Sequence, residues 1–236
     1  MRPRIFQSIP LLIALLGTLL LSSCVIRRGP SVWIENGQPR GRITYVTTPQ
    51  GVTYRYTDHT GILRRMEMRD VNEMLLPGSC TVQYEYDATL RLIEERVLNA
   101  QNQMVPNEDG FARKTYAYSY DARGNKVSDQ CLYDTQGRPV RGRDGFARAK
   151  IVFAGAGNEA AEVFLYDENQ RATAGVWDTV AGTVHIKYMT VEGIGPVRYG
   201  VYYDASGNVI SRKRLSGSLG SYTQVTTHNF GPPPPR

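Results

Sequence analysis

The sequence is poor in the residues that build metal and redox sites. Its 236 residues include only three cysteines and three histidines. His59, His185 and His228 are widely separated, and none has a partner two, three or four residues away of the kind that forms a metal-binding pair. We therefore predict no metal and no cofactor.

Short catalytic motifs are also missing. The nucleophile elbow Gly-x-Ser-x-Gly does not occur, and residues 216–221 form only a glycine–serine loop. The segment from Gly155 to Asn158 lacks the third glycine and the helix of a dinucleotide fingerprint. Neighbouring carboxylates such as Glu94 and Glu95 would point to opposite faces of a strand, so they would not form the facing pair of a glycosidase. The sequence thus predicts that the chain is not an enzyme.

The first long apolar run lies at the N-terminus. Arg2 and Arg4 precede an uncharged apolar segment over residues 9–21. That segment is shorter than the roughly 20 residues of a permanent membrane span. A positive start, a short apolar core and small residues at its end are typical of a secretory signal. We assign residues 1–23 to a signal peptide that is removed.

The end of this segment, Leu21-Ser22-Ser23-Cys24, resembles a bacterial lipobox. The resemblance implies cleavage before Cys24 and attachment of acyl chains such as palmitate to this residue. Two or more acyl chains hold a protein stably on a membrane. Val25, not Asp, follows the cysteine, which by the enterobacterial sorting rule implies the outer membrane, at its periplasmic face or at the cell surface. An ordinary secretory peptide with an incidental Cys24 is the alternative.

The exported part of the chain carries little net charge. The formal charge is +6, and it falls to +4 once residues 1–23, which hold two arginines and no acid, are removed. No run of five or six like charges occurs, which favours a solvated surface with a small basic excess. Nucleic acid is not an expected partner of an exported chain.

Cys80 and Cys131 are the two cysteines outside the lipobox. Their spacing matches no zinc motif. In an exported protein they could form one disulfide or remain two buried free thiols, and spacing alone does not bring them within bridging distance.

Once the signal peptide is removed, 213 residues remain, and they contain internal sequence repeats. Residues 86–113 and 120–148 share Tyr-Asp-Ala at the start and Asp-Gly-Phe-Ala-Arg at the end. Residues 153–172 align with 120–139 without a gap, and Tyr203–Asn208 begins a further copy. Such self-similarity at short intervals is typical of repeat architectures.

Each unit is predicted to form a strand, a turn and a second strand. Tyrosines at every second position, as at Tyr116, Tyr118 and Tyr120, favour a β-strand. The turn is Asp-x-x-Gly, in which Asp accepts hydrogen bonds from the turn backbone and glycine supplies a positive φ. The predicted turn residues are Asp58 and Gly61, Asp121 and Gly124, Asp134 and Gly137, and Asp204 and Gly207. The units at Asp87 and Asp167 lack the glycine, so we expect their turns to differ or to be longer.

This pattern of Tyr-Asp pairs and turn glycines resembles the tyrosine–aspartate (YD) repeats of the Rhs type, in which tandem β-hairpins build a long curled sheet. The resemblance implies an all-β fold with an antiparallel β-hairpin repeat sheet. Rhs proteins are far longer and enclose a toxin, whereas this chain is too short to enclose one, so the toxin-delivery role does not carry over.

Four regions are predicted: the signal peptide over 1–23, a flexible tether over 24–42, the hairpin repeat domain over 43–222, and a proline-rich disordered tail over 223–236. Asp70-Val71-Asn72-Glu73 matches a capping box, which predicts one short helix over Val71–Leu76.

We expect a membrane-anchored cell-envelope lipoprotein that acts as a non-catalytic structural or binding module. Its partners would be the membrane, through the N-terminal lipid, and an unidentified envelope protein or glycan held by exposed tyrosines. The tyrosine before each turn Asp would instead pack between neighbouring hairpins. An envelope glycan hydrolase is the alternative, and the YD resemblance by itself suggests an accessory or immunity component of a toxin or secretion system.

Overall fold

The computed structural model describes residues 31–48, 51–70, 72–154, 159–191 and 197–215, and within them the chain is built of β-strands without a helix. The strands are β1 (Ser31–Glu35), β2 (Gln38–Thr48), β3 (Gly51–Asp58), β4 (Leu63–Arg69), β5 (Thr81–Tyr86), β6 (Leu92–Leu98), β7 (Arg113–Tyr120), β8 (Lys126–Tyr133), β9 (Arg148–Phe153), β10 (Ala160–Tyr166), β11 (Gly175–Trp177), β12 (Val180–Thr183), β13 (His185–Val191), β14 (Val197–Tyr203) and β15 (Val209–Leu215). The predicted all-β class is confirmed. The described residues contain no helix long and apolar enough to span a membrane.

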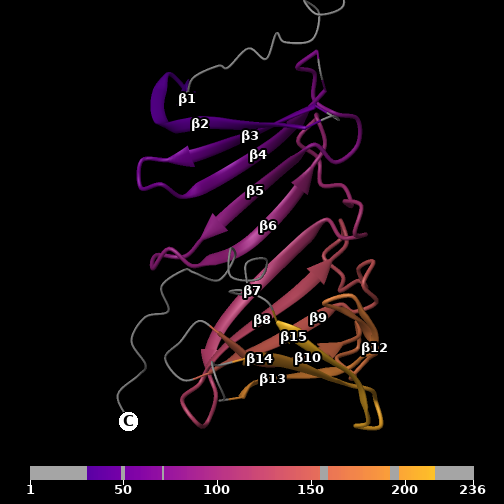
Figure 1. Cartoon of the computed structure of the whole chain (residues 1–236). Coiled ribbons are helices and arrows are strands. Elements are labelled where there is room, and N and C mark those ends of the chain that lie inside the picture. The colour runs from indigo at the N-terminus through magenta and orange to yellow at the C-terminus, as the bar shows by residue number, and fades with distance from the viewer. Residues whose placement is uncertain (1–30, 49–50, 71, 155–158, 192–196, 216–236) are drawn as a thin grey trace, which may run out of the picture.

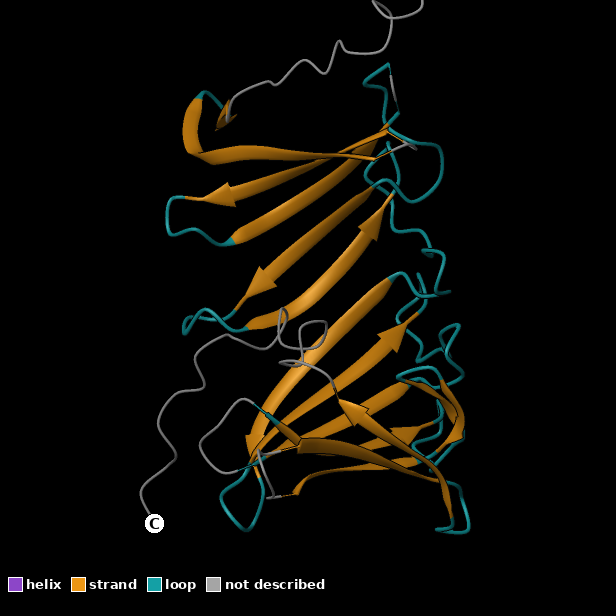
Figure 2. Cartoon of the chain, in the orientation of Figure 1, coloured by secondary structure: helices purple, strands orange, loops and turns teal. Residues whose placement is uncertain are grey.

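The sheet is a meander in which each strand pairs with the next. Thirteen strands form one antiparallel sheet in the order β1 to β10 and then β13 to β15, while β11 and β12 form a separate hairpin. Figures 1 and 2 show a long twisted ribbon, with the β3–β4, β5–β6 and β7–β8 turns along one side and the longer β4–β5, β6–β7 and β8–β9 connections along the other. The ribbon does not close, so β1 and β15 are both edge strands.

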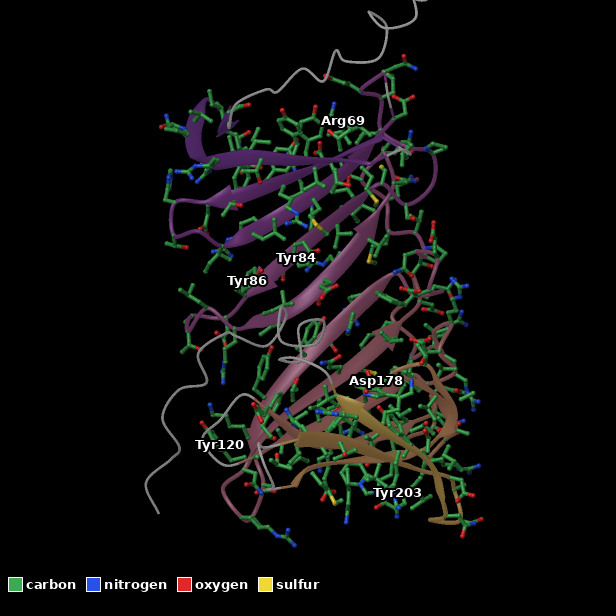
Figure 3. All side chains as sticks on the ribbon, viewed as in Figure 1. Arg69, Tyr84, Tyr86, Tyr120, Asp178 and Tyr203 are labelled. Atoms are coloured by element: carbon green, nitrogen blue, oxygen red, sulfur yellow. The ribbon has the colours of Figure 1, made fainter. Side chains whose placement is uncertain are left out.

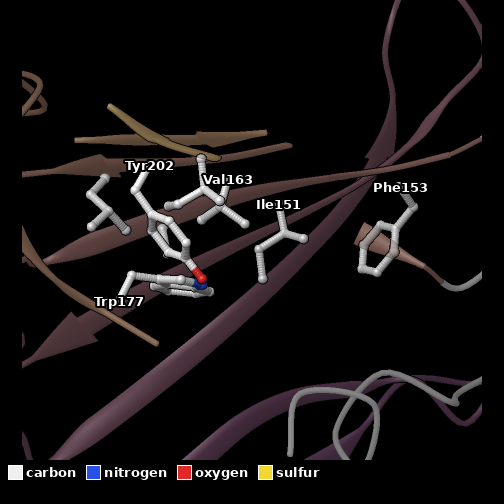
Figure 4. Close-up of a cluster of buried hydrophobic side chains, with 8 residues drawn as sticks. Ile151, Phe153, Val163, Trp177 and Tyr202 are labelled. Atoms are coloured by element: carbon white, nitrogen blue, oxygen red, sulfur yellow. The ribbon is translucent and has the colours of Figure 1, made fainter. Parts of the chain in front are cut away.

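The main core lies in the C-terminal part of the sheet, between β9, β10, β13 and β14 and the β11–β12 hairpin. Register places Ile151, Val163, Ile186 and Tyr202 side by side on one face, which we call the inner face, and the opposite one the outer face. These four side chains are buried together with Trp177 from β11, as Figure 4 shows. Burial of aromatic and branched side chains of this size is the principal favourable term for this end of the molecule.

The β11–β12 hairpin is held against this core by one carboxylate. Asp178, labelled in Figure 3, accepts hydrogen bonds from the hydroxyl groups of Tyr188 and Tyr202, at 3.0 and 2.9 Å. The ammonium group of Lys213 donates to the backbone oxygen of Asp178 and to the hydroxyl of Thr179, both at 2.7 Å. The hairpin is thereby fixed to β13, β14 and β15.

A smaller core lies at the other end of the sheet and on the other face. Trp33 of β1 packs edge-on against Tyr56 of β3, with ring centroids 5.8 Å apart. The Tyr56 hydroxyl donates to the Glu67 carboxylate at 2.7 Å, and the Arg65 guanidinium lies over the Tyr56 ring at 4.1 Å. Because the two cores occupy opposite faces and opposite ends, the sheet is stabilised at two separate places.

One type of turn recurs along the whole chain. In the turn at Asp121, the Asp121 N–H donates to Asn125 O and the Gly124 N–H donates to Asp121 O, at 2.9 and 3.0 Å. The Asp121 carboxylate accepts from the backbone N–H groups of Arg123 and Asn125. The same pair of backbone bonds occurs in the described chain in turns that begin at Asp58, Asp70, Asp87, Asn99, Asn107, Asp121, Asp134, Gly142, Asp167 and Asp204. In all of them except the one at Gly142, the first residue caps its own turn with a side-chain oxygen.

The predicted short helix is wrong, because Asp70 begins such a turn. Its carboxylate accepts hydrogen bonds from the backbone N–H groups of Asn72 and Met74. The first of these bonds is also one that a helix N-cap can make. Glu73 then adopts a left-handed φ of 64°, which reverses the chain instead of continuing a helix. Leu75 pairs with Arg69 in an isolated bridge. A capping box and a capped β-turn favour the same first residue, because in both the side chain of that residue accepts hydrogen bonds from the backbone N–H groups that follow it.

Two further predictions are corrected. The turns at Asp87 and Asp167 are neither longer nor different, because Leu90 and Gln170 take the place of glycine with φ of 63° at both. The flexible tether predicted over 24–42 is wrong for residues 31–42, which form β1 and the first part of β2. Gly37, with φ of 74°, follows Asn36 in the tight turn between them, and this Asn-Gly hairpin signal outweighs the polar composition of the segment.

Candidate binding surface

Tyrosines on the outer face stack against arginines of the neighbouring strand. Arg113 of β7 lies opposite Tyr133 of β8, with its guanidinium 4.5 Å from the ring centroid. Arg148 of β9 lies opposite Tyr166 of β10 at 5.5 Å and also pairs with the Asp129 carboxylate. The two arginines end the repeated Asp-Gly-Phe-Ala-Arg strings, and the two tyrosines precede turn aspartates. The sequence repeat therefore encodes a cation–π stack between adjacent strands.

Tyrosines on the inner face tie each hairpin to the one before it. The Tyr86 hydroxyl donates to Leu63 O at 2.9 Å, and the Tyr118 hydroxyl donates to Leu92 O at 2.7 Å. Arg64 lies over the Tyr86 ring at 5.0 Å and pairs with Asp58 at 2.7 Å. Burial raises the pKa of Tyr86 to about 12, against the opposing effect of Arg64. These tyrosines are engaged in packing, which leaves them less free to hold a partner.

The turn aspartates are held ionised by their own turns. Burial alone would raise the pKa of Asp58, but hydrogen bonds from Thr60, Ile62 and Arg64 outweigh it and lower the pKa to about 2. The pKa of Asp87 is lowered to about 2 for the same reasons, with Arg91 and Thr89 as donors. The oxygens of both carboxylates are occupied by hydrogen bonds from the turn backbone and from an arginine, so we assign these aspartates a structural role.

A buried polar cluster lies at the middle of the inner face. The Tyr116 hydroxyl donates to the Glu95 carboxylate, and the Lys114 ammonium lies 5.1 Å from the centre of the Tyr116 ring. Burial lowers the pKa of Lys114, and burial together with Glu95 raises the pKa of Tyr116. Tyr84 of the neighbouring strand, labelled in Figure 3, has its pKa raised by burial and by Glu95. The cluster joins β5, β6 and β7 through polar contacts.

The N-terminal groove is a hollow of about 520 Å³ beside the turn at Asp58. It brings together aromatic rings, guanidinium groups and carboxylates from β1 to β5. Its lining includes Trp33, Glu35, Arg40, His59, Arg65 and Glu85. Guanidinium and carboxylate groups around a largely buried aromatic residue offer donors and acceptors for the hydroxyl groups of a sugar or for an extended peptide.

A second, smaller groove of about 250 Å³ lies on the outer face and contains Cys131 with Asp129, Tyr133 and Arg148. Cys131 is a half-buried free thiol and Cys80 is a buried free thiol. Of the two alternatives open from the sequence, the structure thus has the free thiols. The backbone N–H of Cys80 donates to Leu98 O, and the backbone N–H of Ala112 donates to Tyr133 O in the same way. Both side chains are fully buried, so Cys80 occupies a position that elsewhere in the sheet takes the small residue Ala112.

The histidines take separate positions. His59 is exposed in the turn after β3, and His228 lies outside the described residues. His185 of β13 stacks between Phe164 and Tyr203, with ring centroids 4.4 and 5.3 Å away, and its Nε2 lies 3.2 Å from the Glu162 carboxylate. This aromatic stack was missed from the sequence, because its members come from three strands whose register alone aligns them.

The predicted lipidation site falls in the N-terminal part of the chain that the structure does not describe. Leu21, Ser22, Ser23 and Cys24 lie outside the described residues, as do residues 223–236. Among the residues that the structure describes, no three His, Cys, Asp or Glu side chains gather as a metal site. No protein-family model matches the chain, and a comparison with curated proteins finds no significant match.

Proposed function

We propose that the protein is a lipid-anchored protein of the bacterial cell envelope whose open sheet is a non-catalytic scaffold for binding. The observation that carries the proposal is the segment Leu21-Ser22-Ser23-Cys24 at the end of a short apolar run. Lipidation at Cys24 would hold the sheet at the membrane, and Val25 after it favours the outer membrane.

The scaffold role is supported by how the repeated residues are used. The Tyr-Asp pairs, the turn glycines and the Asp-Gly-Phe-Ala-Arg arginines serve as packing groups, turn residues and stacking groups. A motif that recurs because every hairpin needs it is typical of a structural repeat. The resemblance to YD repeats agrees with this use.

The anchor is tested by acyl labelling and membrane fractionation of wild type and of Cys24→Ala. We expect wild type to take up the label and sediment with outer membrane, and the variant to be unlabelled and released. Cys131→Ala is the matched control, because it removes a half-buried thiol elsewhere and should keep label and location. Equal labelling of wild type and Cys24→Ala would refute lipidation at this residue.

The N-terminal groove is the place on the described surface where we expect an envelope glycan to bind. Trp33 lines this groove, whereas the only other tryptophan of the sequence, Trp177, belongs to the C-terminal core, so we expect a ligand in the groove to change the fluorescence of Trp33. Soluble envelope glycan fragments should change the fluorescence of wild type with a saturable dependence on concentration. Arg40→Ala and Glu85→Ala should weaken this response, whereas Arg123→Ala, in a distant exposed turn, should not. Without any saturable response, a protein segment replaces the glycan as the expected ligand.

A further inference from the structure

The inner face of the first three strands differs from the rest of the inner face because it is exposed. Val32 and Ile34 of β1 are 61% and 64% exposed, and Val46 of β2 is 47% exposed. Farther along the sheet, inner-face positions such as Ile186 and Tyr202 are fully buried by the curl. β1 and β2 therefore expose apolar side chains to solvent on their inner face, next to the unpaired edge of the sheet.

This surface carries positive charge without negative charge. Register places Arg42 opposite Val32 and Arg55 opposite Thr44, so both arginines share the face of the exposed apolar residues. Neither arginine forms an ion pair with a carboxylate among the described residues. We define the N-terminal inner surface as Val32, Ile34, Arg42, Thr44, Val46 and Arg55.

The acidic residues of the same strands lie on the other side. Glu35 follows Trp33 at the alternate position of β1, and both line the N-terminal groove on the outer face. Asp58, at the end of β3, is paired with Arg64 at 2.7 Å, so it adds no unpaired negative charge. The alternation of side chains along β1 thus places Val32 and Ile34 on one face and Glu35 on the other, where Arg40 of β2 pairs with it at 3.7 Å.

The chain also reaches this edge first after Cys24. Seven residue-to-residue steps, with six residues between, lead from Cys24 to Ser31, the first residue of β1. Fully extended they span at most roughly 25 Å. This step rests on the proposed function: with acyl chains on Cys24, β1 and β2 would stay within this distance of the lipid headgroups. Arg27 and Arg28 within this segment add further positive charge.

We propose that the N-terminal inner surface docks onto an anionic phospholipid surface. The two arginines contact lipid phosphates, and Val32, Ile34 and Val46 enter the headgroup region, as apolar residues beside basic ones do at membrane interfaces. Two elements would hold the sheet at the membrane: the lipid on Cys24 and this surface. Because the N-terminal groove lies on the opposite face of the same strands, docking of this surface would turn the groove away from the membrane.

The test uses the mature chain with Cys24→Ser, which cannot be acylated, so that binding reports the surface alone. Co-sedimentation is measured with vesicles of phosphatidylcholine and with vesicles that contain 30% phosphatidylglycerol, a composition chosen as a probe. We expect binding to the anionic vesicles, little binding to the neutral ones, and loss of binding at high salt.

Charge reversal distinguishes a docking surface from general attraction. Arg42→Glu with Arg55→Glu should lower the partition coefficient on anionic vesicles about tenfold or more, because each arginine near an anionic surface strengthens binding and each glutamate weakens it. Arg123→Glu with Arg171→Glu changes the net charge equally at two exposed turn residues and should lower it far less. Val32→Ser with Ile34→Ser should weaken binding without changing charge.

Each other result overturns the proposal. Equal loss in both charge-reversal pairs means attraction by net charge only, and no binding by the Cys24→Ser chain means that the surface does not dock. If wild type is dimeric in sedimentation velocity and Val32→Ser with Ile34→Ser makes it monomeric, a second copy covers the surface instead. The labelling of Cys24 is scored separately, so a failed anchor and a failed surface are told apart.

Discussion

At the scale of single residues, the fourth position of the recurring turn decides how much strain each hairpin carries. Glycine occupies it at Gly61, Gly124 and Gly207, with φ from 80° to 86°. Leucine and glutamine occupy it at Leu90 and Gln170 with φ of 63°. A left-handed conformation costs a residue with a Cβ about 1–2 kcal/mol. The same fold is therefore built from relaxed and strained copies of one turn.

Leu90→Gly is expected to raise the free energy of unfolding by about 0.5–1 kcal/mol, because glycine relieves the strained φ but loses more chain entropy. Leu90 is 42% exposed, so little packing is lost. Denaturant unfolding measures the change. Gly124→Ala is the reciprocal control: a Cβ there meets no neighbour within 4 Å, so a loss of about 1 kcal/mol would come from the backbone alone. Destabilisation by Leu90→Gly would contradict the strain argument.

The turn carboxylates predict how stability depends on pH. Asp58 and Asp87 have a pKa of about 2 in the folded chain, below the ordinary value of 3.8. Between about pH 4 and pH 2 the unfolded chain binds protons that the folded chain does not, so the free energy of unfolding falls as pH is lowered through this window. Thermal melts at successive pH values measure the fall. Asn99 and Asn107 show that Asn also caps this turn, so Asp58→Asn with Asp87→Asn should fold and show a shallower pH dependence. An unchanged slope would contradict the assignment.

At the scale of elements, the β11–β12 hairpin depends on Asp178. This carboxylate accepts from two tyrosine hydroxyls, one of them on the fully buried Tyr202. Asp178→Ala is expected to lower the free energy of unfolding by about 2–4 kcal/mol, because the hydroxyl groups of the buried Tyr202 and of the half-buried Tyr188 both lose this acceptor. Denaturant unfolding followed by Trp177 fluorescence measures it. Asp178→Asn keeps an acceptor oxygen and should cost clearly less; equal costs would show that the hydrogen bonds contribute little.

At the scale of the whole molecule, an open meander with two separate cores should not open as a single unit. The C-terminal core joins β9, β10, β13 and β14, whereas the N-terminal core centres on Trp33 and Tyr56. Hydrogen exchange should be slowest in the amides of the C-terminal core and faster in β1 to β3. Ile186→Ala should speed exchange in β9 to β14 and leave β2 to β4 unchanged. Equal acceleration at both ends would indicate one cooperative unit.

Much of the hairpin plan could be predicted because its signals are local. Alternating tyrosines mark strands, and the side chain of Asp121 with the freedom of Gly124 forms a turn from four neighbouring residues. The same locality explains the failures. Asp70 and Glu73 satisfy a helix cap and a turn cap equally well, and Leu90 shows that packing of the flanking strands imposes a left-handed residue that propensity disfavours.

The sequence by itself determined the all-β class and the places of most turns, because each depends on residues a few positions apart, and for the same reason it allows an export signal to be predicted. Only the tertiary structure decided which face each side chain occupies and what it meets there. The stacking of Arg113 on Tyr133, the anchoring of Asp178 by Tyr202 and the clustering of Arg42 and Arg55 with Val32 and Ile34 all depend on strand register and on the curl of the sheet. A shift of one residue in register would send each of these groups to the opposite face.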